Sequence, residues 1–162
     1  MRKAREFIIL GLLVLLQTQL LPWWPGTGRS PDLIMLGISM LALMVTPMNA
    51  ILNALLTGLM YDLMVGHPMG LMILTYALCG YAPVAYTRLR PNMRWFEVIA
   101  LIAMITALKE GILMGYCYFT AVYIELSFIT ILLRRLALNC LLALPLYFLF
   151  SLIIGYGDRR HA

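Results

Sequence analysis

The fold is decided by the stretch GLMYDLMVGHPMG at residues 58–70, which places one carboxylate, Asp62, inside an apolar run. A loop that contains Gly66 and Pro68 follows, and a second apolar run begins after it. A charged side chain is costly in hydrocarbon unless a partner or a function offsets that cost. We therefore interpret the stretch as a hairpin between two membrane helices, around which the other helices pack.

The composition of the chain predicts a membrane protein. Hydrophobic residues make up 63% of the 162 residues and charged residues 12%, and the mean hydropathy is +0.91. Soluble domains contain about 45–50% apolar and about 25% charged residues. We therefore expect an all-α polytopic membrane protein with about six spans, forming a single transmembrane domain over residues 1–162. The net charge of +5 fits contact with anionic membrane lipids, and we expect no nucleic-acid partner.

The sequence lacks the motifs of metal sites, intramembrane proteases and nucleotide-hydrolysing enzymes. Cys79, Cys117 and Cys140 lie in or beside apolar runs and form no C-x-x-C pair, while His67 and His161 are isolated. The chain contains no H-E-x-x-H, no G-x-S-x-G and no glycine-rich phosphate loop. We therefore expect no catalytic residue, no metal and no cofactor, and we predict that the protein is not an enzyme.

The first apolar segment could be read as a signal peptide, because it follows a basic start. No small-residue cleavage site follows it, and the run ends instead at Trp23 and Trp24, which favour membrane interfaces. We expect a retained first helix, with both termini of a six-span chain in the cytoplasm. The expected spans cover residues 7–21, 31–46, 48–65, 69–87, 95–117 and 136–156.

The third segment carries two neighbouring stripes with a period of four residues, which share faces of a helix. Small residues at this spacing let helix backbones approach closely, and amides hydrogen-bond across such contacts. We expect this helix to contact protein on two faces. The first stripe contains Asn49, Asn53, Thr57 and Tyr61, and the second contains Ala50, Ala54, Gly58 and Asp62.

The number of spans depends on residues 118–135, an apolar and aromatic segment that contains Glu125. Six spans require this segment to be a loop or to lie at the interface. A seven-span alternative breaks the fifth segment at Lys109 and Glu110. Both topologies place the same number of basic residues on the cytoplasmic side, so charge does not decide between them. We favour six spans by a small margin.

Two buried charges are predicted to pair. Asp62 and Lys109 each lie about 14 residues into helices that run outward from the cytoplasmic side. Both therefore lie about 21 Å from the cytoplasmic ends of their helices, at the same depth. We therefore expect Asp62 to pair with Lys109, while Glu110 points about 100° away around the helix. Asp62 has a functional interpretation, as an ion or substrate ligand, and a structural one. In the structural interpretation, which we favour, the carboxylate accepts backbone N–H groups of the loop at 66–70 or ties two helices together. The candidate structural and interaction residues are Asp62, Gly58, Gly66, Gly70, Lys109, Glu110, Asn53 and Asn139.

The order of the motifs resembles the MreD family of bacterial rod-shape-determining inner-membrane proteins. The motifs are LPWWP at 21–25, SPD at 30–32, the stretch at 58–70, LLRR at 132–135 and Asn139 with LP at 144–145. The resemblance covers nearly the whole chain. It implies a six-span bundle similar to the substrate-binding subunits of energy-coupling-factor transporters, with residues 118–135 outside the membrane.

The resemblance also implies partners. The expected direct partner is MreC, and MreB, RodA and penicillin-binding protein 2 are expected in the same cell-elongation complex. The first functional interpretation is therefore a non-enzymatic membrane scaffold of the rod complex that links the MreB cytoskeleton to peptidoglycan synthesis. The alternative is a small-molecule or lipid-binding subunit of a membrane transporter, in which Asp62, Lys109 and Glu110 line a pocket.

Overall fold

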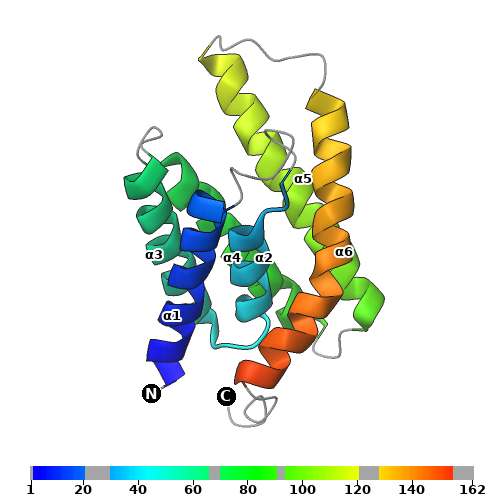
Figure 1. Cartoon of the computed structure of the whole chain (residues 1–162). Helices are drawn as coiled ribbons and strands as arrows, with labels where there is room; N and C mark the ends of the chain where they lie inside the picture. The colour runs from blue at the N-terminus through cyan, green and yellow to red at the C-terminus, as the bar shows by residue number, and fades with distance from the viewer. Residues whose placement is uncertain (1, 21–29, 66–69, 91–93, 121–127, 155–162) are drawn as a thin grey trace.

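The computed structural model describes residues 2–20, 30–65, 70–90, 94–120 and 128–154. Within these residues the chain forms a helical bundle in which successive helices run in opposite directions (Figure 1). The start of the first helix and the end of the last lie at the same end of the bundle (Figure 1). The expected all-α fold is therefore confirmed. Gly66, His67 and His161 lie outside the described residues.

Six α-helices are present in the described residues, and a π-helical segment, η1, continues the first of them. By length and composition, α3, α5 and most of α6 could each cross a membrane. The helices are α1 (Arg2–Leu15), η1 (Leu16–Leu20), α2 (Leu33–Ala42), α3 (Pro47–Val65), α4 (Leu71–Leu89), α5 (Trp95–Phe119) and α6 (Phe128–Ile154).

The short helix α2 lies at the centre of the bundle. Nine of its ten residues are buried, and it contacts each of the other five helices. Ten residues of α-helix extend about 15 Å, which is half the thickness of a hydrocarbon core of about 30 Å. At least one end of α2 therefore lies at membrane depth, where its unpaired backbone groups need protein partners.

Helix α3 packs most extensively against α4, and the small residues of its predicted stripe make this close contact possible. A Cβ atom on Gly58 would lie 2.7 Å from the Cα atom of Ile73. A Cβ atom on Gly80 of α4 would lie 2.7 Å from the Cβ atom of Ala54. The two stripes of α3 are buried against protein, as predicted. The opposite face, which includes Leu63, is exposed. The prediction that α3 is the central helix, with the other helices packed around its hairpin with α4, is wrong, because α2 occupies the centre.

The seven-span alternative is wrong, because α5 is continuous from Trp95 to Phe119 and contains Lys109 and Glu110 as buried residues. The last helix begins at Phe128, whereas the sequence predicted a start at Leu136. The arginine pair at 134–135 therefore lies inside α6 and not before it. Residues 121–127 lie outside the described part, so the expectation for the loop itself stays a prediction.

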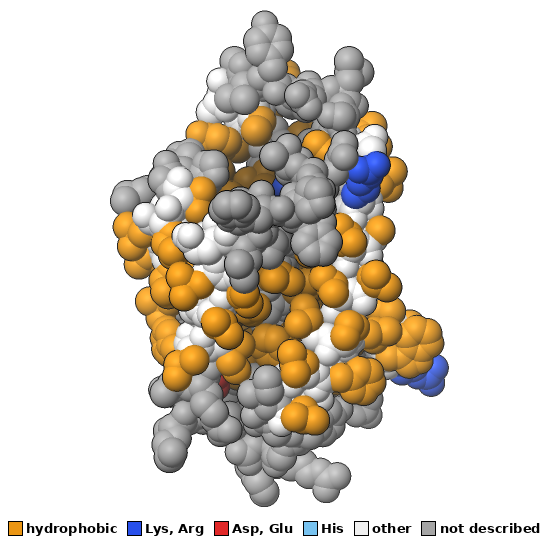
Figure 2. All heavy atoms as spheres, viewed as in Figure 1, with side chains coloured by type: hydrophobic (Ala, Val, Ile, Leu, Met, Phe, Trp, Pro, Cys, Tyr) orange, Lys and Arg blue, Asp and Glu red, His pale blue; other side chains and the backbone are white. Residues whose placement is uncertain are grey.

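The outer surface of the bundle is largely hydrophobic. Among the described side chains on the face in Figure 2, hydrophobic ones predominate and charged ones are few. Helix α6 is the most exposed of the three long apolar helices. Only 11% of its 18-residue apolar stretch is buried, compared with 33% for α3 and 39% for α5. Such a surface suits a lipid environment or contact with another membrane helix.

Candidate functional site

A buried ion pair joins α5 to the start of α2. Asp32 is the N-cap residue of α2, and its Oδ1 atom accepts a hydrogen bond of 3.0 Å from the backbone N–H of Met35. Its Oδ2 atom accepts a hydrogen bond from the Nζ atom of Lys109. Both side chains are at most 8% exposed. The prediction that Lys109 pairs with Asp62 is therefore wrong.

Asp62 does not pair with Lys109 because its carboxylate already accepts hydrogen bonds from the start of α4. Its Oδ2 atom accepts hydrogen bonds from the backbone N–H of Gly70 at 2.9 Å and of Ile73 at 3.3 Å. Gly70 is the N-cap residue of α4, has a φ of 103° and provides no side-chain cap of its own. Asp62 thus caps α4 from the neighbouring helix, which agrees with the structural interpretation of this carboxylate.

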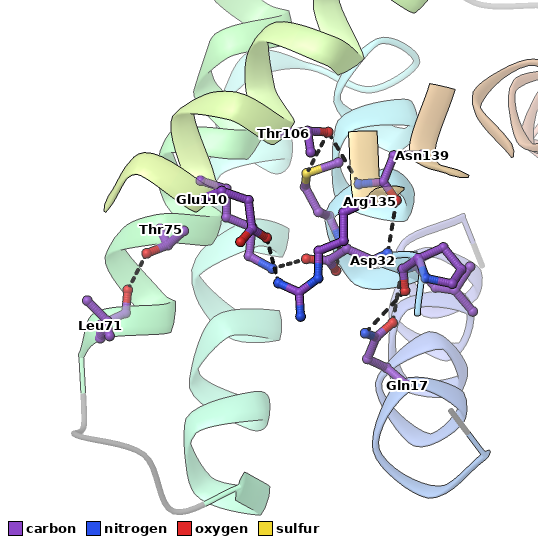
Figure 3. Close-up of polar contacts among 12 residues, drawn as sticks. Gln17, Asp32, Leu71, Thr75, Thr106, Glu110, Arg135 and Asn139 are labelled. Carbon is purple, nitrogen blue, oxygen red and sulfur yellow. Dashed lines mark hydrogen bonds and ion pairs between the residues drawn. The ribbon is translucent and has the colours of Figure 1, made fainter. Parts of the chain in front are cut away.

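A second ion pair and an asparagine join α6 to α5 and to the start of α2. The residues in these contacts form what we call the polar cluster: Asp32, Thr106, Lys109, Glu110, Arg135 and Asn139. The Nη1 atom of Arg135 donates to the Oε1 atom of Glu110 at 2.7 Å. The Oδ1 atom of Asn139 accepts from the backbone N–H of Asp32 at 3.0 Å, and its Nδ2 atom donates to the Oγ1 atom of Thr106 at 3.3 Å. These side chains converge from α2, α5 and α6 (Figure 3).

The π-helical segment η1 supplies a further contact to α2. The Oε1 atom of Gln17 accepts from the backbone N–H of Leu33 at 2.9 Å, and its Nε2 atom donates to the carbonyl oxygen of Pro31 at 3.4 Å. Together with Asn139 and Asp32, Gln17 accepts hydrogen bonds from backbone N–H groups at the start of α2, which have no partner within the helix. The sequence analysis missed Gln17, although an amide inside the first apolar run was a usable signal.

A cavity of about 330 Å³ lies beside the Asp32–Lys109 ion pair. Three tyrosines from three different helices line it together with charged and apolar side chains, and the Lys109 ammonium lies 5.3 Å from the centre of the Tyr76 ring. The transporter alternative expected a pocket lined by Asp62, Lys109 and Glu110, and of these three residues only Lys109 lines this cavity. Its lining residues are Gln17, Ser30, Asp32, Tyr61, Leu71, Met72, Tyr76, Lys109, Leu113, Tyr116, Cys117 and Arg135.

The remaining candidate residues lie in other contacts. The Nδ2 atom of Asn53 donates to the Oε2 atom of Glu6 at 2.9 Å, which joins α3 to α1 through two buried side chains. Gly58 allows the close contact between α3 and α4, and Gly70 begins α4 and donates its backbone N–H to Asp62. The structure thus brings Lys109, Glu110 and Asn139 together and places Asp62 and Asn53 elsewhere. In the described ranges, no group of three His, Cys, Asp or Glu side chains is placed to hold a metal ion.

The fold and the site together define a small polytopic membrane protein in which buried charges and amides join helices. The family model for the rod shape-determining protein MreD matches residues 1–156, so the chain belongs to the MreD family. Membership gives it a role in rod shape determination. Comparisons with curated proteins and with solved structures gave no match, so the expected similarity to energy-coupling-factor subunits stays a prediction.

Proposed function

We propose that this protein is a non-enzymatic scaffold of the bacterial cell-elongation complex and that it binds MreC within the inner membrane. Through MreC it would link the MreB cytoskeleton to the peptidoglycan synthases RodA and penicillin-binding protein 2. The observation that carries the proposal is the match to the MreD family over residues 1–156.

The contacts of the buried charges support a scaffold. Asp32 is paired with Lys109 and Glu110 with Arg135, and each pair joins two helices. Polar contacts between helices in a bilayer fix how those helices pack. A bundle held in one arrangement in this way offers a partner a fixed surface, which is what a scaffold needs.

The open face of α6 is the surface that best suits a partner helix. The small-residue stripe of α3 is buried against α4, so it is not available to MreC. Large exposed side chains recur on α6 at intervals of one or two helical turns and share a face. The residues are Ile129, Leu133, Leu141, Phe148 and Leu152. We propose this α6 face as the contact with the transmembrane helix of MreC.

Both termini are proposed to lie in the cytoplasm. The start of α1 and the end of α6 lie at one end of the bundle (Figure 1). The N-terminal residues Arg2, Lys3 and Arg5 lie at that end of the sequence, and cytoplasmic segments are rich in such residues. In this orientation the loop between α2 and α3 is cytoplasmic and the loop between α3 and α4 is periplasmic.

The test is affinity purification of the tagged chain from gently solubilised membranes, followed by mass spectrometry of proteins and small molecules. We expect MreC and the elongation synthases to be recovered. The alternative, a transporter subunit, draws support from the cavity beside Lys109. Recovery of an ATP-driven energising subunit in place of MreC would overturn the scaffold proposal and establish that alternative.

The contact face can be tested in the same cells with a photo-crosslinking residue at one position at a time. Leu141 on α6, Met104 on α5 and Leu74 on α4 are matched sites, because they are 72%, 56% and 58% exposed. We expect MreC to crosslink to position 141 and not to positions 74 or 104. Crosslinks only from α4 or α5 would contradict the proposed face and leave the partnership intact.

A further inference from the structure

The cavity beside the ion pair has the size and the wall chemistry of a binding site. Its volume of about 330 Å³ falls at the lower end of the roughly 300–1,000 Å³ that ligand pockets occupy. Its walls come from η1, α3, α4, α5 and α6, with Ser30 and Asp32 before α2. None of the contacts that hold the helices together requires an open space there.

The wall of the cavity carries one more cation than carboxylate, which favours an anion; Glu110, which pairs with Arg135, is not part of the wall. Lys109 and Arg135 are the two lining cations, and Asp32 is the lining carboxylate. One N–H bond of the Lys109 ammonium is directed at Asp32, which is its single hydrogen-bond acceptor among the residues described. The Arg135 side chain is 25% exposed although it pairs with Glu110, so it remains within reach of a bound molecule. A guanidinium beside an ammonium is a common arrangement for phosphate recognition.

The rest of the wall suits the uncharged part of a ligand. Leu71, Met72 and Leu113 give an apolar surface, and Tyr61 and Tyr116 add rings whose hydroxyls can donate or accept. We propose that the cavity binds the phosphate group of a small phosphate ester between Lys109 and Arg135, with the organic part against the tyrosines. A phospholipid headgroup and a water-soluble phosphate ester share this chemistry.

The experiment uses the full-length protein, stripped of lipid in a neutral maltoside detergent. Glycerol 3-phosphate and phosphatidylglycerol are the two phosphate probes, and glycerol and diacylglycerol are their phosphate-free counterparts. Native mass spectrometry detects the bound molecule, and thermal unfolding reports its effect on stability. We expect one phosphate probe to bind with one equivalent per chain and to raise Tm, while its phosphate-free counterpart does neither. Which of the two phosphate probes binds identifies the source.

Two neighbouring substitutions separate binding in the cavity from binding at the lipid-facing surface. Leu113→Trp fills the cavity, whereas Met114→Trp adds the same ring at an exposed position on the same helix. We expect Leu113→Trp to weaken binding of the active probe by about tenfold or more and Met114→Trp to change it by less than about twofold. Equal affinity in both variants, or equal effects of phosphate and phosphate-free probes, would overturn the proposal.

A measurement on the unmodified chain covers the case in which Leu113→Trp does not fold. Cys117 lines the cavity, and Cys140 of α6 does not. We expect the bound phosphate probe to slow alkylation of Cys117 by N-ethylmaleimide and to leave alkylation of Cys140 unchanged. Alkylation of Cys117 at the same rate with and without the probe would contradict occupancy of the cavity. This inference stands apart from MreC binding, so either can fail alone.

Discussion

Lys109 of α5 forms a buried ion pair with Asp32, the residue that caps the start of α2. The pair does two things at once. The carboxylate closes the first turn of α2 through Met35, and the ammonium balances its charge inside the bundle. Because α2 is too short to reach both membrane surfaces, its start needs such an internal cap.

Removing one member of this pair is expected to destabilise the protein strongly. Lys109→Met leaves the Asp32 carboxylate buried and unpaired, and we expect a loss of about 3–5 kcal/mol in the free energy of unfolding. Asp32→Asn with Lys109→Met removes both charges and keeps a cap oxygen, so it should recover much of that loss. Denaturant unfolding of the purified variants in micelles measures both. A double variant no more stable than Lys109→Met would show that the pair is not coupled.

The charge of Asp62 is expected to matter less than its oxygen. Asp62→Ala removes the acceptor for the N–H groups of Gly70 and Ile73 and should cost about 1–3 kcal/mol. Asp62→Asn keeps one side-chain oxygen. The other carboxylate oxygen, Oδ1, is buried without a hydrogen-bond partner in the described chain, so replacing it with an amide nitrogen breaks no hydrogen bond. We expect Asn to stay within about 1 kcal/mol of the wild type in the same unfolding assay. An Asn variant as unstable as Ala would mean that the charge itself is required.

The close approach of α3 and α4 is expected to depend on Gly58. Gly58→Ala places a Cβ atom 2.7 Å from the backbone of Ile73, and helix backbones cannot move aside as a flexible side chain can. We expect a loss of about 1–3 kcal/mol, measured by thermal or denaturant unfolding. Gly111→Ala is the matched control, because a Cβ atom there meets nothing within 4 Å. It should be neutral or stabilise by up to about 1 kcal/mol. Equal effects at both positions would rule out packing as the reason.

Asn139 is expected to hold α6 against α2. Asn139→Ala leaves the backbone N–H of Asp32 without its acceptor, which should lower the free energy of unfolding by about 1–3 kcal/mol. Asn139→Asp keeps the acceptor but adds a second carboxylate beside Asp32, and we expect it to be less stable than the Ala variant. Leu141→Ala, two residues away and exposed, serves as the control. If Ala at 139 and Ala at 141 have the same effect, the asparagine contacts contribute nothing.

The helical bundle and its closest helix pair could be predicted from sequence because both rest on local patterns. Apolar runs predicted the helices, and the period of four around Gly58 predicted the contact that α3 makes. Pro31 and Asp32 correctly marked the start of α2. The start of α6 was placed too late, because its first residues, from Phe128 onward, form part of an apolar segment with no clear boundary.

The polar cluster could not be predicted because it depends on depth and on three-dimensional neighbours. Asp32 was expected at the start of the second span, and only the structure shows that this start is buried within reach of Lys109. The tyrosines of the cavity come one each from α3, α4 and α5, so no spacing along the chain relates Tyr61, Tyr76 and Tyr116. The π-helical turn that holds Gln17 has no recognised sequence signal.

The separation of Asp32 from its partners along the chain has a consequence for synthesis. Lys109 follows Asp32 by 77 residues, and Asn139 follows it by 107. At about 5–20 residues per second, roughly 4 to 15 seconds pass between translation of the aspartate and translation of its lysine. Helix α2 therefore leaves the ribosome with an uncompensated carboxylate at its start. Its contacts with Lys109 and Asn139 can form only after α5 and α6 have been made, so these are the last of its helix contacts to become possible.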